Sequence, residues 1–164
     1  MNTRLVGSEM CIRDRSKQFQ NILDYGSGSG ILGIAAKKLM PYSKITLIDN
    51  DNLALKMSKF NLKKNNIISN NNVLEVSSKK KKHIKKNFYN LIFANILLPQ
   101  LKSLIKEFTY ILDHNGLLIV SGILIYQKNH LINLYRKFKI YPIKISEEEK
   151  WITITFKKKN EKAY

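Results

Sequence analysis

Residues Ile22–Gly30 read Ile-Leu-Asp-Tyr-Gly-Ser-Gly-Ser-Gly, and this stretch determines the fold class. A short apolar run, typical of a buried strand, ends at an acid, and three alternate glycines follow. The next apolar residues recur at helical spacing: Ile31, Leu32, Ala35, Ala36 and Leu39. Glycines allow a sharp turn and the close approach of a ligand, and the helix start behind them offers unpaired N–H groups. The order of strand, glycine-rich turn and helix predicts the first unit of a nucleotide-binding α/β domain.

Two registers of this turn indicate different cofactors. Residues 28–33, Gly-Ser-Gly-Ile-Leu-Gly, match the dinucleotide fingerprint G-x-G-x-x-G and would indicate an NAD-binding oxidoreductase. The other register, Asp24-x-Gly26-x-Gly28-x-Gly30, resembles motif I of the Rossmann-like methyltransferases that use S-adenosylmethionine. A carboxylate two residues before the first glycine suits a ligand that carries an ammonium group and would repel a pyrophosphate. We favour the second register, and a turn that only connects strand to helix is the remaining alternative.

The composition indicates one globular domain without a membrane anchor. The chain has 164 residues, 44% of them hydrophobic, and no apolar run of membrane-spanning length or signal-peptide pattern. We therefore expect a cytoplasmic protein. The single cysteine, Cys11, excludes an internal disulfide, and the three histidines lack the clustering of a metal site. The net charge of +17 suits nucleic-acid binding, but a chain rich in Lys, Asn and Ile is also typical of an AT-rich genome.

The rest of the chain continues the alternation of strands and helices. Apolar runs and turn residues predict further strands at 44–49, 70–76, 88–96, 116–121, 140–145 and 151–156. Helical patterns lie at 52–63, 98–112 and 124–138. In the first of these helices we expect four residues to face the core: Leu53, Met57, Phe60 and Leu62.

Polar residues follow two of these strands at positions that suit ligand binding. Asp49 ends the second strand, where an acid faces the ribose bound over the first turn, whereas Asp51 lies nearer the start of the next helix. Asn95 ends the continuous apolar run 88–96, which is typical of a central strand buried on both faces. Ligands of open α/β sheets bind at such carboxyl ends, so Asn95 is a candidate ligand-binding residue. The alternative is that Asn95 only forms a turn or caps a helix.

A run of lysines interrupts the pattern between the third and fourth strands. Lys79, Lys80, Lys81 and Lys82 are followed by His83 and two more lysines at 85–86. Such a run is usually a solvated loop or helix. The alternative is a contact with rRNA or an acidic partner.

Three segments together resemble the bacterial methyltransferases of ribosomal protein L-eleven. They are Asp24–Ala36, Ala94–Leu97 (Ala-Asn-Ile-Leu) and Leu118–Leu124, which contains Ser-Gly-Ile-Leu. The resemblance covers about residues 20–158. It implies a Rossmann-like class I fold, a seven-stranded, mostly parallel sheet with helices on both faces. It also implies transfer of methyl groups from S-adenosylmethionine to lysine side chains and α-amines of a large-subunit ribosomal protein. Separately from the resemblance, we expect a monomer and no metal site.

The resemblance also implies roles for individual residues. Gly26 and Gly28, with Asp24, would bind the methionine end of the cofactor, and Asp49 would hold the ribose. Asn95 would lie beside both the cofactor and the incoming amine, as the one catalytic residue. Ser27 departs from the family, which usually has Cys there, and Gly33 replaces a usual Ser or Ala.

Two alternatives to this function remain. In one alternative the substrate is an amine of a nucleic-acid base. Methyltransferases of that class carry a motif similar to Asn-Pro-Pro-Tyr at the end of the fourth strand, where the aromatic ring stacks on a flipped base. This chain has Asn95-Ile96-Leu97-Leu98 at that place, and the missing aromatic argues against a base substrate. A basic module that binds rRNA without catalysis is the other alternative, and a salt-dependent RNA affinity without cofactor affinity would favour it.

The amino-terminal segment differs from the rest of the chain. Residues 1–15 lack helical or strand periodicity, and 5–15 resemble the in-frame translation of an adapter used for sequencing libraries. We expect 1–15 to be foreign and 16–164 to be the catalytic domain, without the family's amino-terminal substrate-recognition domain. We also expect the loss of a covering helix to expose apolar sheet surface, and the fragment alone to be inactive.

Overall fold

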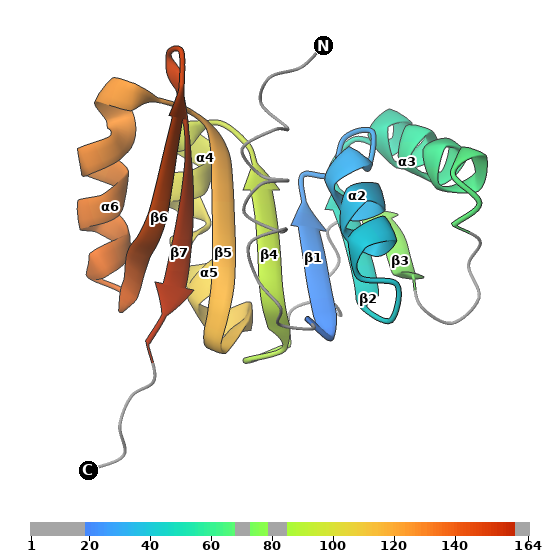
Figure 1. The fold of residues 1–164 in the computed structure, drawn as a ribbon, viewed down its shortest axis with the longest axis horizontal. Coiled ribbons are helices and arrows are strands. Elements are labelled where there is room, and N and C mark those ends of the chain that lie inside the picture. The colour runs from blue at the N-terminus through green and yellow to red at the C-terminus, as the bar shows by residue number, and fades with distance from the viewer. Residues whose placement is uncertain (1–18, 68–72, 79–84, 160–164) are drawn as a thin grey trace.

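The computed structural model describes residues 19–67, 73–78 and 85–159, and these form one seven-stranded sheet with helices on both faces (Figure 1). The strands are β1 (Asn21–Tyr25), β2 (Lys44–Asp49), β3 (Val73–Ser78), β4 (Tyr89–Asn95), β5 (Leu112–Leu124), β6 (Ile140–Glu148) and β7 (Trp151–Lys158). Their order in the sheet is β3-β2-β1-β4-β5-β7-β6. The helices are α2 (Ile31–Leu39), α3 (Asn52–Lys64), α4 (Leu98–Ser103), α5 (Ile105–Ile111) and α6 (Lys128–Arg136), with a 3₁₀ turn at Ile125–Gln127.

The sheet is parallel except around β7. Strands β1 to β5 pair in parallel, and β7 pairs antiparallel with both β5 and β6. The chain starts at β1, moves outward through β2 to β3, and then returns to place β4 on the other side of β1. This reversal creates a crevice between β1 and β4 at the carboxyl ends of the strands, where α/β sheets bind ligands. The seven-stranded, mostly parallel architecture predicted from the sequence is confirmed.

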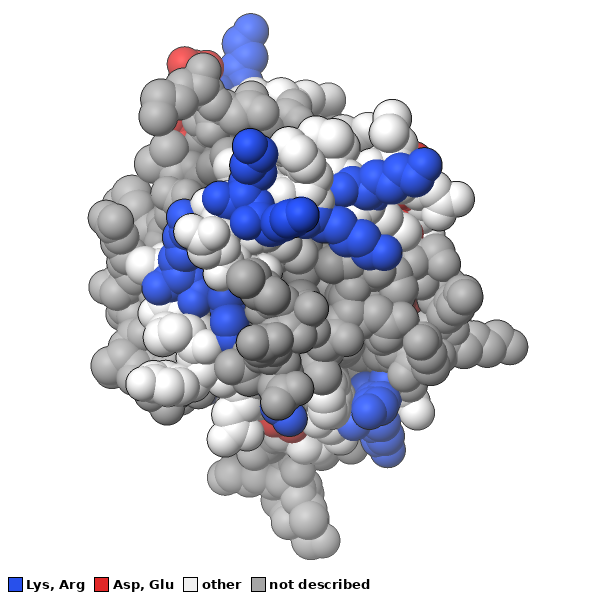
Figure 2. All heavy atoms as spheres, turned by 90° about the vertical axis from the view of Figure 1, so that its right-hand side faces the viewer, with Lys and Arg blue, Asp and Glu red and all other residues white. Residues whose placement is uncertain are grey.

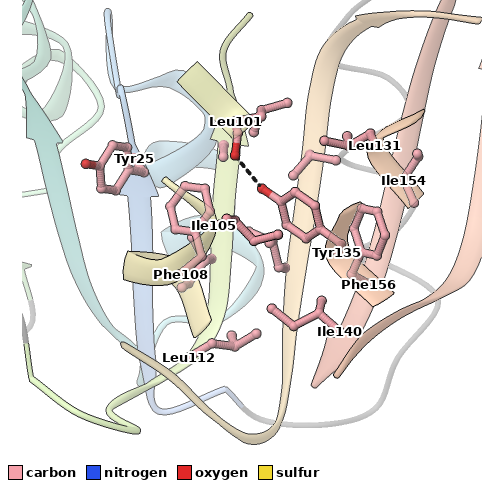
Figure 3. Packing of buried hydrophobic residues seen from close by; sticks show 14 of the residues in the cluster. Tyr25, Leu101, Ile105, Phe108, Leu112, Leu131, Tyr135, Ile140, Ile154 and Phe156 are labelled. Carbon is pink, nitrogen blue, oxygen red and sulfur yellow. Dashed lines mark hydrogen bonds between the residues drawn. The ribbon is translucent and has the colours of Figure 1, made fainter. Parts of the chain in front are cut away.

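Alternating strand residues build two cores, one on each face of the sheet. On one face, where α2 packs over β1 and β2, the buried cluster includes Ile22, Leu47, Leu91 and Phe93. On the other face α4, α5 and α6 pack over Leu23, Ile92 and Leu118 (Figure 1). Figure 3 shows the centre of this second core, where the Tyr135 hydroxyl of α6 donates a 3.0 Å hydrogen bond to the carbonyl oxygen of Leu101. This bond ties α6 to α4, the helix that borders the crevice.

Several boundaries differ from those predicted. The strand predicted at 70–76 is Val73–Ser78, and the helix predicted at 98–112 is divided at Leu104 into α4 and α5. Leu101, Ile105 and Phe108 keep the spacing of one helix face across the division, and each is at most 5% exposed. The helix predicted at 124–138 begins as a 3₁₀ turn and is α-helical only over Lys128–Arg136. Strand β6 extends past its predicted end at 145, because Glu147 and Glu148 pair with β7.

The inward face of α3 was predicted correctly for Leu62 and wrongly for the other three residues. Leu53, Met57 and Phe60 are 65%, 46% and 54% exposed, and the buried residues are Leu55, Ser58 and Leu62. The reason is that Ser58, a polar residue, faces inward and is fully buried, since its hydroxyl donates to the carbonyl oxygen of Gly28 at 2.8 Å. The exposed side of α3 also carries four lysines, Lys56, Lys59, Lys63 and Lys64. Figure 2, which faces this edge, shows basic side chains gathered over its upper part.

Within the whole chain, Leu91, Phe93, Leu117 and Ile119 are at most 3% exposed. The expectation that loss of a covering helix exposes apolar sheet surface stays a prediction. The predictions for residues 1–15 and for Lys79, Lys80, Lys81 and Lys82 lie outside the described residues.

Candidate functional site

A cavity of about 350 Å³ occupies the crevice between β1 and β4. The loop ends after β1, β2 and β4 form three of its sides, and helix α4 forms another. Its lining residues are Tyr25, Gly26, Ile48, Asp49, Asn50, Ile96, Gln100, Ser103 and Leu104. The sequence pointed to Gly26 and Asp49 in this set. It gave no sign of the α4 residues, because only the folded sheet brings that helix beside the glycine turn.

Three glycines with left-handed backbone shape the glycine turn: Gly26, Gly28 and Gly30. Gly26 has φ 69°, and a Cβ atom there would lie 2.7 Å from Cγ2 of Ile96, so only glycine lets β1 and β4 approach this closely. Gly28 has φ 55°, and a Cβ atom there would meet nothing within 4 Å. The backbone at Gly28 therefore stands open on the side where a ligand would approach.

Asp49 links the glycine turn to the start of α3. One carboxylate oxygen accepts from the N–H of Gly28 at 2.8 Å, and the other accepts from the N–H of Asp51 at 2.9 Å. Each oxygen has a further lone pair, so the carboxylate can still accept hydrogen bonds from two hydroxyl groups. Asp51 does not line the cavity; it caps α3 by accepting from the N–H of Leu53 at 2.8 Å, as the sequence predicted.

Asp24 lies beneath the glycine turn and does not line the cavity. Its side chain is 1% exposed and accepts a 2.9 Å hydrogen bond from the N–H of Gly33 in the first turn of α2. Burial raises the pKa of this carboxyl from 3.8 to about 7, the Gly33 hydrogen bond opposes the rise, and the charge of Asp49 adds to it. The geometry thus shows a residue that anchors the turn to the helix, and its direct contact with a ligand stays a prediction.

Asn95 ends β4 beside a bulge of β5. It pairs with Ser121, and a Cβ atom on Gly122 would lie 3.0 Å from the Asn95 side-chain oxygen. Gly122 has φ 84°, which places this backbone in the left-handed region. The Asn95 Oδ1 atom is buried and accepts no hydrogen bond from the described residues. A buried acceptor without a donor is costly, so this oxygen is a candidate acceptor for a ligand N–H.

Two residues of α3 also belong to the site, although the sequence analysis missed them. Ser58 donates to the carbonyl oxygen of Gly28, and the Asn61 amide donates to that of Ser29 at 2.9 Å. Together they fix the glycine turn from below. Their spacing of three residues on a helix that follows the turn was the available signal, but polar residues on a helix normally indicate a solvated face.

Two further kinds of site are absent from the part of the chain that the structure describes. It has no cluster of three or more His, Cys, Asp or Glu residues that would hold a metal ion. None of its helices is long and apolar enough to cross a membrane.

Comparisons with known proteins agree with this geometry. The family model for ribosomal protein L11 methyltransferase (PrmA) matches residues 7–159. The ribosomal protein L11 methyltransferase of Prochlorococcus marinus strain MIT 9515 is 34% identical over 157 residues, which cover 92% of this chain and 52% of that protein. The ribosomal protein L11 methyltransferase of Agrobacterium fabrum is 30% identical over 145 residues, which cover 88% of this chain and 49% of that protein. The chain thus spans about half the length of the curated relatives it matches.

Solved structures show the same fold. A ribosomal protein L11 methylase from Lactobacillus delbrueckii subsp. bulgaricus superimposes with a TM-score of 0.81 at 24% identity, covering 98% of this chain and 81% of that one. A precorrin-6y C5,15-methyltransferase from Geobacter metallireducens superimposes with a TM-score of 0.74 at 15% identity. The match covers 97% of this chain and 90% of that one. With the glycine turn, the crevice and the family match over residues 7–159 in agreement, the chain belongs to the ribosomal protein L11 methyltransferase family.

Proposed function

We propose that this chain is the catalytic part of an S-adenosylmethionine-dependent methyltransferase that modifies amines of ribosomal protein L11. The observation that carries the proposal is the crevice itself, which Gly26 and Asp49 line. The open Gly28 backbone and the buried Asn95 oxygen lie at the same end of the sheet, outside the lining of the cavity. The family match supports the same substrate. The methylation of lysine side chains and of the α-amine, in the cytoplasm, belongs to this proposal.

The residues of the crevice fit the cofactor. Asp49 retains lone pairs for the two ribose hydroxyls, and the glycine backbone at 26–28 leaves room for the methionine end. The carboxyl of Asp24 lies behind that backbone and favours an ammonium group once it is ionised. No phosphate-binding arrangement competes with this, since a pyrophosphate over the same turn would face Asp49 and Asp24.

The chain's own contribution to the reaction is positioning. When bound, the cofactor supplies an electrophilic methyl group on a sulfonium. The Asn95 oxygen would accept a hydrogen bond from the neutral amine and hold its lone pair in line with that methyl group. Ile96 and Leu104 line the cavity and exclude water, which disfavours the charged form of an incoming lysine and so favours the reactive amine.

Calorimetry on the 164-residue chain tests the cofactor assignment. S-adenosylhomocysteine, the demethylated product, should bind, and NAD should not. Tighter binding of NAD would overturn the choice of register. A salt-dependent RNA affinity without any S-adenosylhomocysteine binding would instead support a module without catalysis.

Asn95→Ala tests the catalytic assignment, in a chain that transfers methyl groups to ribosomal protein L11. We expect methyl transfer to fall more than cofactor affinity, because the oxygen would contact the amine. Gly122→Ala is a matched variant, since its Cβ would lie 3.0 Å from that oxygen and displace it without deleting it. Unchanged turnover of both variants at saturating cofactor would reduce Asn95 to a structural residue.

The domain boundary stays part of the proposal. We expect transfer to ribosomal protein L11 to be much weaker from the 164-residue chain than from a relative of which it covers about half, such as that of Prochlorococcus marinus strain MIT 9515. Full activity of the 164 residues would contradict this. A contact of Lys79, Lys80, Lys81 and Lys82 with rRNA, and a monomeric state, also stay predictions.

A further inference from the structure

A second hollow lies at the opposite end of the sheet from the crevice. It measures about 490 Å³ and lies where β4 and β5 begin and β7 ends (Figure 1). We call it the lysine pocket, and its lining residues are Lys86, Asn87, Lys106, Thr109, Tyr110, His114, Phe138, Lys139, Lys158 and Lys159. Five of these described residues are lysines and none is acidic.

Backbone hydrogen bonds hold the walls of the lysine pocket together. The N–H of Asn87 donates to the carbonyl oxygen of Tyr110 at 2.9 Å, which joins the start of β4 to the end of α5. The N–H of Lys159 donates to the carbonyl oxygen of Lys139 at 3.0 Å, which joins the end of β7 to the turn before β6. The backbone segments that carry these lysines are therefore hydrogen-bonded to one another.

The floor of the pocket is a network around Lys158. Its ammonium group donates to the carbonyl oxygens of Thr109 and Leu112 at 2.7 and 2.8 Å, and to the side-chain oxygen of Asn87 at 2.8 Å. The last bond orients the Asn87 amide, so its nitrogen faces Nε2 of His114 at 3.0 Å. An amide nitrogen can only donate, so Nε2 accepts and the proton of the neutral ring lies on Nδ1. The network thus fixes the Lys158 ammonium group at the floor of the pocket, with all three of its N–H donors bonded to the chain, and holds the His114 ring beside it.

We propose that the lysine pocket binds the phosphate backbone of single-stranded RNA. Lysine ammonium groups are point charges that suit phosphates, and Lys86, Lys106 and Lys159 line the pocket beside the fully bonded Lys158. Tyr110, which is 47% exposed, stands among them and offers a face on which a base can stack. The concave shape suits a strand better than a flat lipid surface. The choice of RNA over DNA rests on the proposed function, since ribosomal proteins are assembled with RNA.

Two triple variants test the proposal by the salt dependence of binding. The pocket variant carries Lys86→Gln, Lys106→Gln and Lys159→Gln, and leaves Lys158 to its structural bonds. The matched control carries Lys56→Gln, Lys59→Gln and Lys63→Gln on the exposed side of α3, at the edge that Figure 2 faces. Both variants lose the same net charge. Binding of a fluorescent oligouridylate is followed by anisotropy over a range of salt concentrations.

The pocket variant should lower the salt slope by about 2, because each phosphate contact of a single strand contributes roughly 0.7. The α3 control should change the slope much less. Tyr110→Leu should weaken binding about fivefold or more at an unchanged slope, because it removes a stacking face and no charge. Equal slopes for the two triple variants would show attraction by net charge alone and overturn the proposal.

Two further measurements separate this proposal from its competitors. Displacement of the oligonucleotide by ATP at equal phosphate concentration would assign the pocket to free nucleotides and overturn the RNA assignment. So would loss of binding to anionic vesicles, rather than RNA, in the pocket variant. S-adenosylhomocysteine binding should be the same in all variants, because no residue is shared between the pocket and the crevice. Its absence in the unmodified chain would contradict the proposed function and leave the RNA result standing.

Discussion

The two ends of the sheet are built in different ways. At the carboxyl ends, backbone conformation makes the crevice: left-handed glycines, an acid that receives N–H groups, and a buried carboxyl below them. At the amino ends, long lysine side chains from separate loops and helices make the lysine pocket. The first kind of site needs particular residues at fixed spacing in one short stretch. The second needs only positive side chains that the fold brings together, so its residues are scattered along the chain.

The difference explains what each end can tolerate. A backbone site should fail after single substitutions, because there a Cβ atom or a lost acceptor changes the shape of the turn. A side-chain site should respond in proportion to the charge removed. The four predictions below test this contrast, from the largest expected effect to the smallest.

Neutralising Asp24 should give the largest change. Its folded pKa of about 7 lies above the ordinary 3.8, so its contribution to stability is full below pH 3.8 and is lost as the pH rises through about 7. Asp24→Asn keeps an acceptor for Gly33 and removes this titration. In urea unfolding, the free energy of unfolding of the variant relative to that of the unmodified chain should rise by up to about 4 kcal/mol as the pH is raised from 3.8 to 7. Parallel pH profiles for the two proteins would contradict the buried position of the carboxyl.

Gly26→Ala should destabilise the fold by about 2–4 kcal/mol. It combines a left-handed backbone with a Cβ atom 2.7 Å from Ile96, so strain and overpacking add. Gly28→Ala is the matched control, because it keeps the strain of φ 55° and meets no atom of the chain within 4 Å. It should cost about 1–2 kcal/mol, and should weaken S-adenosylhomocysteine binding more than it weakens the fold. Equal destabilisation by both variants would show that contact with β4 is unimportant.

Asp49→Ala should raise the dissociation constant for S-adenosylhomocysteine about tenfold or more, since a hydrogen bond to a charged group is worth about 1.5–3 kcal/mol. Asp51→Ala should instead lower stability by about 1 kcal/mol through loss of the α3 cap, with little change in affinity. Calorimetry and thermal unfolding of both variants measure the two effects. Similar affinities for the two variants would remove the ribose assignment.

Tyr135→Phe should have the smallest effect, a loss of about 1 kcal/mol of stability. The ring at position 135 keeps its stacked contact with Phe156, in which the ring centroids are 4.9 Å apart. Only the hydrogen bond to the carbonyl oxygen of Leu101 is lost (Figure 3). Because this tie lies between the two ends, neither cofactor nor RNA binding should change. A large fall in cofactor affinity would show instead that α4 depends on α6 for its position at the crevice.

Much of the fold could be predicted because its signals are local. The glycine turn, the acid at the end of β2 and the apolar run of β4 each occupy one short segment, and the structure places Gly26 and Asp49 in one cavity. The inward face of α3 could not be predicted, because burial of Ser58 depends on the Gly28 carbonyl from another element.

The remaining errors have the same origin. The division between α4 and α5 and the extension of β6 depend on packing and pairing with β7, which no local pattern shows. The lysine pocket could not be predicted, because only Lys86 belongs to the lysine run and its other lysines lie in separate segments that the fold alone brings together. Asn95 was identified by its position at a strand end, whereas its contact with the Gly122 bulge required the sheet.

The position of β7 has a consequence for how the chain assembles during synthesis. Strand β6 emerges before β7, yet its neighbour in the sheet is β7 and not β5. The close pairing of Glu148 with Trp151 lets the two strands form a hairpin quickly, whereas alignment of β7 with β5 joins residues far apart in the chain. Until that slower step is complete, β5 presents an unpaired hydrogen-bonding edge, which is a template for aggregation. Docking of the β6–β7 hairpin therefore covers the exposed edge of β5. Substitutions in the turn of this hairpin should lower the yield of folded protein more than they lower its final stability.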